Sequence, residues 1–304
     1  MSWFSDEGGE YALVVADQYG NDRRNIALEN PTFYYTPRWS PDSRHLAFGD
    51  ADRNLWVLDV ESGKTQRVAN EGFAHPQRLL EPVWSPDSRW LAYSRRLPNE
   101  FNAVFVYSLD SGEATQVTDG LSDCHGPAWD RDGKHLYFLA STDFGMNVGW
   151  LDMSSINLPL NYAIYVAVLD ASAPSPLAPQ SDDETPAAEA DQEDGADAGE
   201  TPTVAIDFAA LDQRILALGV PTRPYSALRT GEQGVLFYQE QVPNEPGFTL
   251  HRYILADREA KVVTKGIEQY VLSADGKKLL LAQPENTWVI ADAAGEPTPG
   301  EGVL

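Results

Sequence analysis

Short stretches of alternating apolar and polar residues recur along the chain, and each predicts a β-strand. Three of these stretches, HLAF, WLAY and HLYF, follow a turn that begins with tryptophan. The turns start 45 residues apart, at Trp39–Ser43 (WSPDS), Trp84–Ser88 (WSPDS) and Trp129–Gly133 (WDRDG). A second and a third alternating stretch follow within each repeat. Four short strands separated by turn residues in about 45 residues are typical of a β-propeller blade.

The pattern predicts an all-β chain folded as a β-propeller of four-stranded blades, with six units recognisable. The expected blades span approximately 1–28, 33–70, 83–118, 127–218, 224–265 and 267–292, within a propeller of residues 1–298. The first and last units are incomplete. One segment, Ile206–Leu218, also fits a helical period, because Leu211, Ile215 and Leu218 fall on one helical face. Its place in the repeat favours strands.

Two insertions interrupt the period. The first, 144–161, is too apolar for a solvated loop and too rich in Gly and Pro for a helix, so we expect it to fold over the propeller or contact another domain. The second, 173–202, has the Pro, Ala and acidic composition of a disordered segment. Residues 299–304 are interpreted as the start of a linker.

The tryptophan turns are interpreted as scaffold. Proline fixes φ at a turn position, and the aspartate that follows it accepts a hydrogen bond from the backbone two residues further on. The tryptophan is expected to pack between neighbouring blades. These residues therefore predict architecture rather than catalysis.

The 304 residues carry a net charge of −24, which argues against nucleic acids and anionic membrane surfaces as partners. Nine of the carboxylates lie between Asp182 and Glu200, so the charge describes the second insertion more than a binding face. A single cysteine, Cys124, excludes an internal disulfide. No apolar run approaches the roughly 18 residues of a membrane-spanning helix, and the N-terminus is not a signal peptide.

A search for catalytic motifs finds none of the familiar nucleophile, metal or phosphate signatures. His45, His135 and His251 fall in alternating strands and are interpreted as strand residues. Cys124 and His125 are neighbours, and a hydrolase that uses this pair stays open as a minor catalytic hypothesis. Adjacent residues of an extended chain point to opposite sides, however, which argues against it. No cofactor and no metal site are predicted.

Several segments together carry a family resemblance. They are Trp3–Tyr11, Pro31–Tyr35 leading into the first tryptophan turn, Phe138–Phe144, Tyr162–Leu169, Pro174–Pro179 and Ile206–Ile215. In this order the chain resembles the seven-bladed propeller of tricorn proteases along nearly all its length. The tryptophan turns alone are also shared with TolB-like propellers.

The resemblance implies a non-catalytic domain of a large modular serine peptidase, which binds, filters or channels peptides toward catalytic modules. In that family the catalytic Ser and His follow the propellers, so none is assigned to this chain. It also implies peptides or unfolded polypeptide, and the other domains of the same peptidase, as partners, and a homo-oligomer of the full-length protein. The missing first strands of blade one suggest an absent N-terminal part. A cytoplasmic location is expected, and a periplasmic one if the true N-terminus is absent.

Loops that enter the innermost strands of a propeller surround one mouth of its axial channel. The peptide-channel candidates there are Phe33, Tyr34, Tyr35, Arg78, His125, Tyr225, Arg229 and Tyr270. Aromatic rings would hold apolar peptide side chains, and arginine would pair with a carboxylate terminus. The alternative is that the aromatic residues pack between blades. A second function also stays open, a stand-alone TolB-like scaffold that binds a protein partner.

Overall fold

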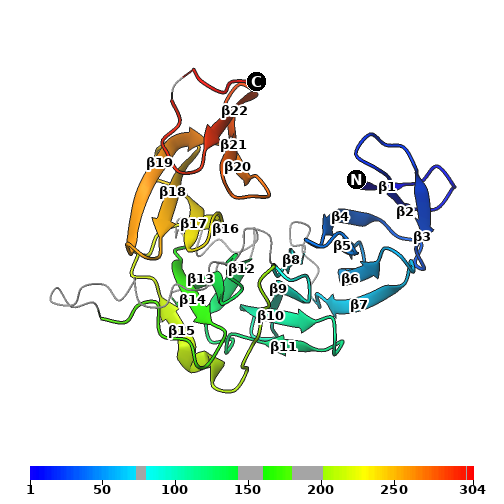
Figure 1. Cartoon of the computed structure of the whole chain (residues 1–304), viewed down its shortest axis with the longest axis horizontal. Coiled ribbons are helices and arrows are strands. Elements are labelled where there is room, and N and C mark those ends of the chain that lie inside the picture. Colours follow the sequence, from blue (N-terminus) through cyan, green and yellow to red (C-terminus); the bar gives the residue numbers. More distant parts are fainter. Residues whose placement is uncertain (73–79, 143–159, 180–200, 299) are drawn as a thin grey trace. The chain divides into compact units, whose positions relative to one another are not determined.

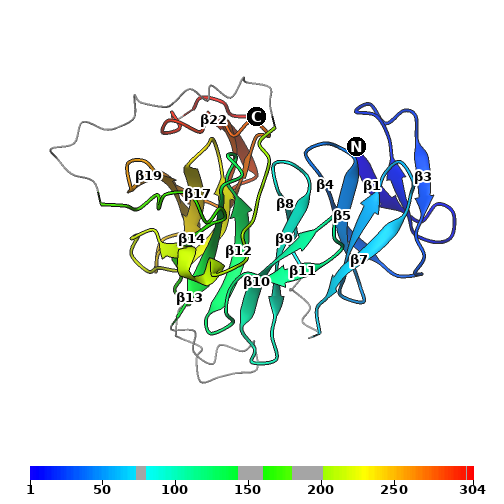
Figure 2. The same ribbon diagram turned by 60° about the horizontal axis from the view of Figure 1, so that its bottom comes forward.

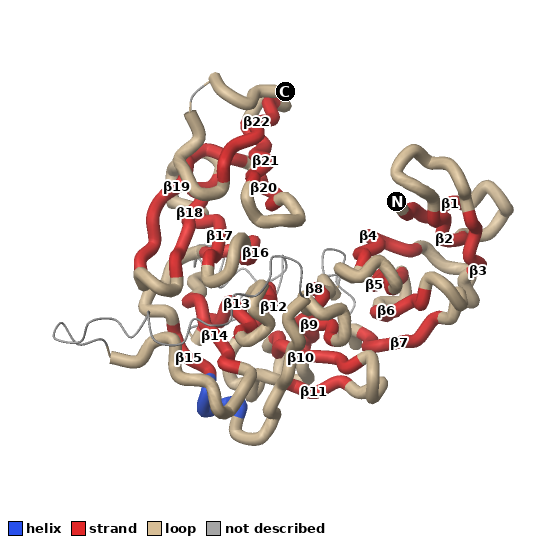
Figure 3. Tube along the Cα trace, viewed as in Figure 1, coloured by secondary structure: helices blue, strands red, loops and turns tan. Residues whose placement is uncertain are grey.

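The computed structural model describes residues 1–72, 80–142, 160–179, 201–298 and 300–304. Within these residues the chain consists of β-strands and one short 3-10 helix (Figure 3). The strands of the described ranges form six antiparallel sheets of three or four strands, in which consecutive strands are neighbours (Figures 1 and 2). The predicted all-β propeller architecture is confirmed.

The chain divides into two compact units, the first comprising Met1–Trp129 with Phe138–Leu160 and the second comprising Asp130–Tyr137 with Asn161–Leu304. In the first unit, sheet one contains β1 (Ser2–Ser5), β2 (Ala12–Val15) and β3 (Arg24–Ala27). Sheet two contains β4 (Tyr34–Trp39), β5 (His45–Asp50), β6 (Asn54–Asp59) and β7 (Thr65–Asn70). Sheet three contains β8 (Val83–Trp84), β9 (Trp90–Arg96), β10 (Asn102–Ser108) and β11 (Ala114–Gln116).

Sheet four contains β12 (Asp123–Trp129), β13 (His135–Ser141), β14 (Ala163–Val168) and β15 (Ile215–Ala217), and the division between the units falls within it. In the second unit, sheet five contains β16 (Tyr225–Thr230), β17 (Val235–Glu240), β18 (Phe248–Ile254) and β19 (Glu259–Ile267). Sheet six contains β20 (Gln269–Leu272), β21 (Lys278–Gln283) and β22 (Thr287–Asp292).

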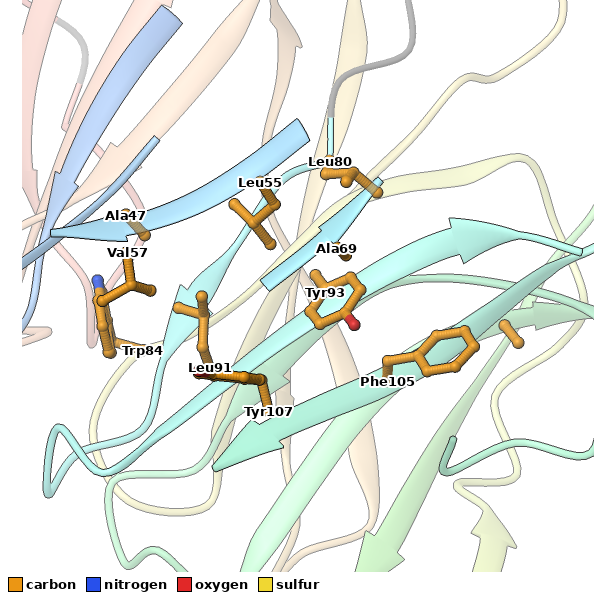
Figure 4. Packing of buried hydrophobic residues seen from close by; sticks show 11 residues of the cluster. Ala47, Leu55, Val57, Ala69, Leu80, Trp84, Leu91, Tyr93, Phe105 and Tyr107 are labelled. Atoms are coloured by element: carbon orange, nitrogen blue, oxygen red, sulfur yellow. The ribbon is translucent and has the colours of Figure 1, made fainter. Parts of the chain in front are cut away.

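Sheets one, two and three pack face to face in the first unit, as do sheets five and six in the second, which explains why their middle strands are apolar on both faces. On β5, Leu46 and Phe48 belong to the core between sheets one and two, whereas Ala47 belongs to the core between sheets two and three. Figure 4 shows the second of these cores, in which Leu55 and Val57 of β6 face Leu91 and Tyr93 of β9. The alternation of period two therefore sends neighbouring side chains into two different cores.

The turns after β4, β8 and β20 are closed by their own side chains. The Ser40 hydroxyl donates to Asp42 Oδ1 at 2.5 Å and accepts the backbone N–H of His45 at 2.9 Å. Asp42 also accepts the N–H of Arg44, the bond expected of aspartate in this turn. Equivalent bonds recur at Ser85 with Asp87 and at Ser273 with Asp275. Hydrogen bonds from Ser273 and Lys277 lower the pKa of Asp275.

The repeat tryptophans join consecutive sheets of the first unit. Trp84 Nε1 donates to the Arg38 carbonyl on β4 at 3.0 Å, and Trp129 Nε1 donates to the Val83 carbonyl on β8 at 3.0 Å. The Trp84 ring also lies in the core between sheets two and three. The predicted packing of this tryptophan between blades is confirmed.

Replacing this indole should therefore cost stability. We expect Trp84→Phe to lower the free energy of unfolding by about 1–2 kcal/mol, because one buried hydrogen bond and part of a ring are lost. Urea denaturation monitored by circular dichroism measures the change. Trp288→Phe is the control, since Trp288 makes no indole hydrogen bond within the described residues; equal losses in both variants would contradict the assignment.

Four segments differ in detail from the sequence predictions. Ile206–Leu218 contains both a 3-10 helix, η1 (Leu211–Arg214), and strand β15, so its mixed pattern reflects both structures. The segment before Pro127, expected to be a loop, already belongs to β12 from Asp123 onward, because a positive φ of 63° at Gly126 bends the strand without ending it.

The other two segments were expected to be irregular, and the structure shows that parts of both are bonded to the fold. Residues 302–304, expected to begin a linker, pair with β22 instead, since Ile290 N–H donates to Gly302 O at 2.8 Å. Within the acidic insertion 173–202, the Pro176 and Ala178 carbonyls accept hydrogen bonds from Arg258 Nη2, so its first part is attached to the fold. The insertion 144–161 lies almost entirely outside the described residues, as do residues 180–200.

Candidate functional site

The first strand of sheets two to six is an edge strand, which pairs within its own sheet on one side only. These strands are β4, β8, β12, β16 and β20. Apart from Arg78, which is outside the described residues, the peptide-channel candidates lie on these strands or next to them. The conformation of each first strand therefore decides which candidates reach solvent.

A bulge interrupts two of the first strands, β4 and β16, and β12 has a residue of positive φ at the equivalent position. The pairing register of β4 breaks between Tyr35 and Arg38, and Thr36 has a φ of 40°. On β16 the register breaks between Ser226 and Arg229, and Ala227 has a φ of 52°. On β12 the equivalent residue is Gly126, because both Gly126 and Thr36 lie three residues before the tryptophan of their turn. The φ of Gly126 is also positive, at 63°. A residue in this conformation twists the strand and redirects the side chains beside it.

The residues before this positive-φ position, Thr36, Gly126 or Ala227, are buried or exposed in the same order on three strands. The residue two positions before it is buried, and these residues are Tyr34, Cys124 and Tyr225. The residue immediately before it is exposed or half-buried, and these residues are Tyr35, His125 and Ser226. The alternation of the strand therefore separates these residues into those that pack inward and those that face solvent.

On β4, Phe33 and Tyr35 are exposed and Tyr34 is not. Phe33 is 59% exposed and Tyr35 38%, and the Phe33 ring lies 5.3 Å from the ring of Tyr11. Tyr34 packs against Phe4 and Phe48, and its hydroxyl donates to the Asn30 carbonyl at 2.6 Å. Burial raises the pKa of Tyr34. Tyr34 thus stabilises sheets one and two, while its two neighbours are available to a ligand.

On β12, His125 lies beside a buried carboxylate. Its Nδ1 is 3.9 Å from Asp123 Oδ2, and its side chain is 34% exposed. Asp123 is fixed by Asn102, whose backbone N–H and Nδ2 both donate to Asp123 Oδ1, at 2.8 and 2.7 Å. Burial lowers the pKa of His125 and outweighs the opposing effect of the Asp123 charge. This histidine can accept or donate a hydrogen bond at neutral pH.

The cysteine beside it is poorly suited to nucleophilic chemistry. Cys124 is 1% exposed, and its Sγ lies 3.3 Å from the Ser122 hydroxyl. Burial raises the pKa of the Cys124 thiol, which therefore stays protonated at neutral pH. A reactive cysteine needs a lowered pKa and access to solvent. The geometry does not favour the hydrolase hypothesis based on Cys124 and His125.

The candidates of the second unit are mostly structural. Tyr225 packs edge-on against Tyr238 at 4.8 Å, and burial raises the pKa of Tyr225 to about 12. The Tyr270 hydroxyl donates to the carbonyls of Ala227 and Phe237, at 2.5 and 2.9 Å, and so joins sheets five and six. Arg229 is exposed on the strand to which Tyr270 is bonded. Arg78 lies outside the described residues.

The third tryptophan turn departs from the other two, since Asp130 and Arg131 replace Ser and Pro. Asp130 is 1% exposed and accepts the Tyr137 hydroxyl at 2.6 Å and the Gly234 N–H at 3.1 Å. Burial, reinforced by the Asp132 charge, raises the pKa of Asp130. The Arg131 guanidinium donates to the carbonyls of Gly231 and Ala274. This turn connects to sheets five and six of the second unit.

Among the described residues, Asp130, Asp132 and His135 have ligand atoms within 4.8 Å of one another, a spacing that could hold a metal ion. Each already has a partner in the protein. Asp132 Oδ2 lies 3.0 Å from His135 Nδ1, and Asp132 Oδ1 accepts the Lys134 N–H at 2.7 Å. With the bonds of Asp130, these contacts favour a structural role for the cluster.

The sequence model of the tricorn protease second beta propeller domain matches residues 1–293. The chain belongs to this family. Tricorn protease homolog 1 of Streptomyces coelicolor is 28% identical over 300 residues, which are 92% of this chain and 27% of that protein. A crystal structure of the tricorn protease superposes with a TM-score of 0.72 at 16% identity, covering 96% of this chain and 28% of that chain. This tricorn-type propeller therefore spans little more than a quarter of the length of these proteins.

The sequence likeness to TolB is more local. The Tol-Pal system protein TolB of Chromobacterium violaceum is 33% identical over 73 residues, which are 23% of this chain and 17% of that protein. The tricorn family, by contrast, accounts for nearly the whole chain. Within the described residues, no helix of this tricorn-type propeller is long and apolar enough to cross a membrane.

Sequence reasoning missed Asp123 with Asn102, and Asp130 with Arg131. A signal for the second pair was present, because the tricorn-type repeat has Ser-Pro at Ser40 and Ser85 but Asp-Arg at the third tryptophan turn. For the first pair the signal is weak. Asp123 and Asn102 are 21 residues apart and meet only through the packing of β10 and β12.

Proposed function

We propose that this tricorn-type propeller binds extended peptide segments beside its first strands and delivers them to catalytic modules elsewhere in the parent peptidase. The observation that carries the proposal is the exposure of two neighbouring aromatic positions on β4. Phe33 and Tyr35 flank the buried Tyr34, and both rings face solvent beside an edge strand. Edge strands and exposed aromatic rings are the two elements by which proteins bind extended peptides.

The polar candidates add contacts of a second kind. His125, held beside Asp123, can form a hydrogen bond with a peptide amide or carbonyl. Arg229 in the second unit can pair with a carboxylate. Tyr34, Tyr225 and Tyr270 contribute indirectly, because their buried hydroxyls and rings fix the strands that carry the exposed residues.

The relatives support hydrolysis as an activity of the whole protein. They are named tricorn proteases and are more than three times as long as this chain. We therefore assign peptide bond cleavage to the remainder of the parent protein, and substrate selection to this propeller. Association with the other domains, and a homo-oligomer of the full-length protein, belong to the same proposal.

Peptide binding by the 304-residue chain tests the proposal. The probe is fluorescein-labelled oxidised insulin B chain, an unstructured peptide rich in apolar residues, and fluorescence anisotropy gives the dissociation constant. We expect saturable binding, and a loss of affinity of about tenfold or more in the double variant Phe33→Ser, Tyr35→Ser, because aromatic anchors dominate such interfaces. Mass spectrometry should show that the probe stays intact.

Tyr19→Ser is the matched control, because Tyr19 is 78% exposed but lies in the turn between β2 and β3. It should bind the probe like the parent chain. Equal affinity of the double variant and the parent chain would refute peptide binding at β4. Cleavage of the probe that persists through purification to homogeneity would refute the non-catalytic role.

A further inference from the structure

A cavity of about 420 Å³ lies in the first unit, between sheets two and three. Its walls come from β5, β6, β7 and β10, with Val57 and Leu109 as apolar surface. Small-molecule sites in proteins have volumes of about 300–1,000 Å³. None of the peptide-channel candidates lines this cavity, so any ligand it holds is independent of peptide binding at β4.

Two buried polar atoms at this cavity have no hydrogen-bond partner in the described protein. They are the hydroxyl of Tyr107 and Nδ1 of His45. Tyr107 is 2% exposed and belongs to the core between sheets two and three (Figure 4). Burial raises the pKa of Tyr107, so its hydroxyl stays neutral and can donate a hydrogen bond. Buried polar groups in native proteins nearly always have a partner, which points to a polar guest at this position.

The cavity also carries one charge of each sign. Asp59 Oδ1 accepts the Ser62 N–H at 2.6 Å, and hydrogen bonds from Ser62 lower the pKa of Asp59, so it is a carboxylate at neutral pH. Asp59 Oδ2 lies 3.7 Å from His45 Nε2. The Lys64 side chain is exposed, and among the described residues it forms no ion pair. The cationic and anionic groups at this cavity are therefore not paired with each other.

We propose that this cavity binds a small zwitterion of the amino acid class. The ligand ammonium group would bind Asp59, and its carboxylate would bind Lys64 and the Tyr107 hydroxyl, with the Gln66 amide beside them. Val57 and Leu109 would contact an aliphatic side chain. A ligand with opposite charges at its two ends matches a cavity that carries the Asp59 carboxylate, beside His45, and the Lys64 ammonium, and its carboxylate gives the Tyr107 hydroxyl an acceptor.

Saturation-transfer NMR titration of the 304-residue chain with L-leucine tests the assignment. We expect saturable binding below about 20 mM, and binding at least about tenfold weaker for N-acetyl-L-leucine and for L-leucinamide, each of which lacks one of the two charges. Asp59→Asn, Lys64→Met and Tyr107→Phe should each weaken L-leucine binding by about tenfold. The last two variants keep the fold, because Lys64 is exposed and Tyr107→Phe removes only an unpartnered oxygen.

The control exchanges an exposed ion pair elsewhere. Lys278 Nζ lies 2.6 Å from Asp292 Oδ1 in the second unit, and neither residue lines the cavity. The double variant Lys278→Met, Asp292→Asn should bind L-leucine as the parent chain does. Absence of saturable L-leucine binding would overturn the proposal. So would binding that survives both Lys64→Met and Tyr107→Phe, or equal affinity for L-leucine and its two singly charged analogues.

Discussion

Asp130→Ala is expected to lower the free energy of unfolding by about 3 kcal/mol. The substitution removes the acceptor of two buried groups, the Tyr137 hydroxyl and the Gly234 N–H, and leaves both without a partner. An unsatisfied buried group costs about 1–3 kcal/mol, and the cavity left by the carboxylate adds to this cost. Urea denaturation followed by circular dichroism measures the loss.

The pH dependence of the same position supplies a second measurement. Because burial raises the pKa of Asp130 above 3.8, the folded state binds its proton more tightly than the unfolded state. Its contribution to stability is full below pH 3.8 and is lost as the pH rises through the raised value. The amide of Asp130→Asn cannot titrate. The free energy of unfolding of this variant should therefore fall further below that of the parent chain at about pH 5 than at about pH 7.

Asp275→Ala serves as the control for Asp130. Asp275 is exposed, and its carboxylate contacts only groups of its own turn, Ser273 and Lys277. We expect a much smaller loss of stability from this variant. Equal losses for Asp130→Ala and Asp275→Ala would contradict a connecting role of Asp130 between sheets four and five.

Gly276→Ala should destabilise the chain to a similar or larger extent, by about 3–5 kcal/mol. Gly276 has a φ of 75°, a conformation that costs an alanine roughly 1–2 kcal/mol. A β-carbon at this position would lie 2.6 Å from the carbonyl carbon of Gly231 and 2.9 Å from the nitrogen of Glu232. Because both atoms are backbone, the overlap is relieved only by shifting a turn of sheet five, which adds an overpacking cost of about 1–3 kcal/mol.

Gly295→Ala is the matched control for Gly276→Ala. Gly295 has no neighbouring heavy atom within 4 Å of the added carbon, and its φ is not positive. Its thermal midpoint should stay near that of the parent chain, whereas that of Gly276→Ala falls by about 10 °C or more. Equal thermal midpoints for Gly276→Ala and Gly295→Ala would contradict the prediction, because they would show that the turn of Gly276 can move away from Gly231 and Glu232 without loss of stability.

The turns could be predicted from local sequence, whereas the cores could be predicted only in part. The tryptophan turns were recognisable because proline, aspartate and a residue able to adopt positive φ are needed within a few positions, and Asp42, Asp87 and Asp275 make the expected bonds. The alternation of the middle strands was equally clear. It did not reveal that Leu46 and Ala47 enter two different cores, because period two specifies two faces and not what covers each face.

The candidate site shows the opposite case. Phe33, Tyr34 and Tyr35 are three consecutive aromatic residues, and nothing in their order indicates that the middle one is buried and the outer two exposed. The pairing of β4 with β5 decides this, because Tyr34 and Tyr35 pair regularly with Asp50 and Gly49 before the bulge, and the register sets which of the two alternating faces enters the core. Tyr270 likewise looked like a ligand contact and is instead a buried tie to Ala227 and Phe237.

The sequence by itself determined the all-β repeat, the tricorn-type family and the residues of the turns, since these depend on contacts between residues near one another in the chain. Tertiary structure alone decided which aromatic side chains are exposed, that Asp130 and Arg131 connect to sheets five and six, and that Asp59, Lys64 and Tyr107 share one cavity. Each of these depends on the packing of segments far apart in sequence, where a shift of one residue exchanges a buried side chain for an exposed one.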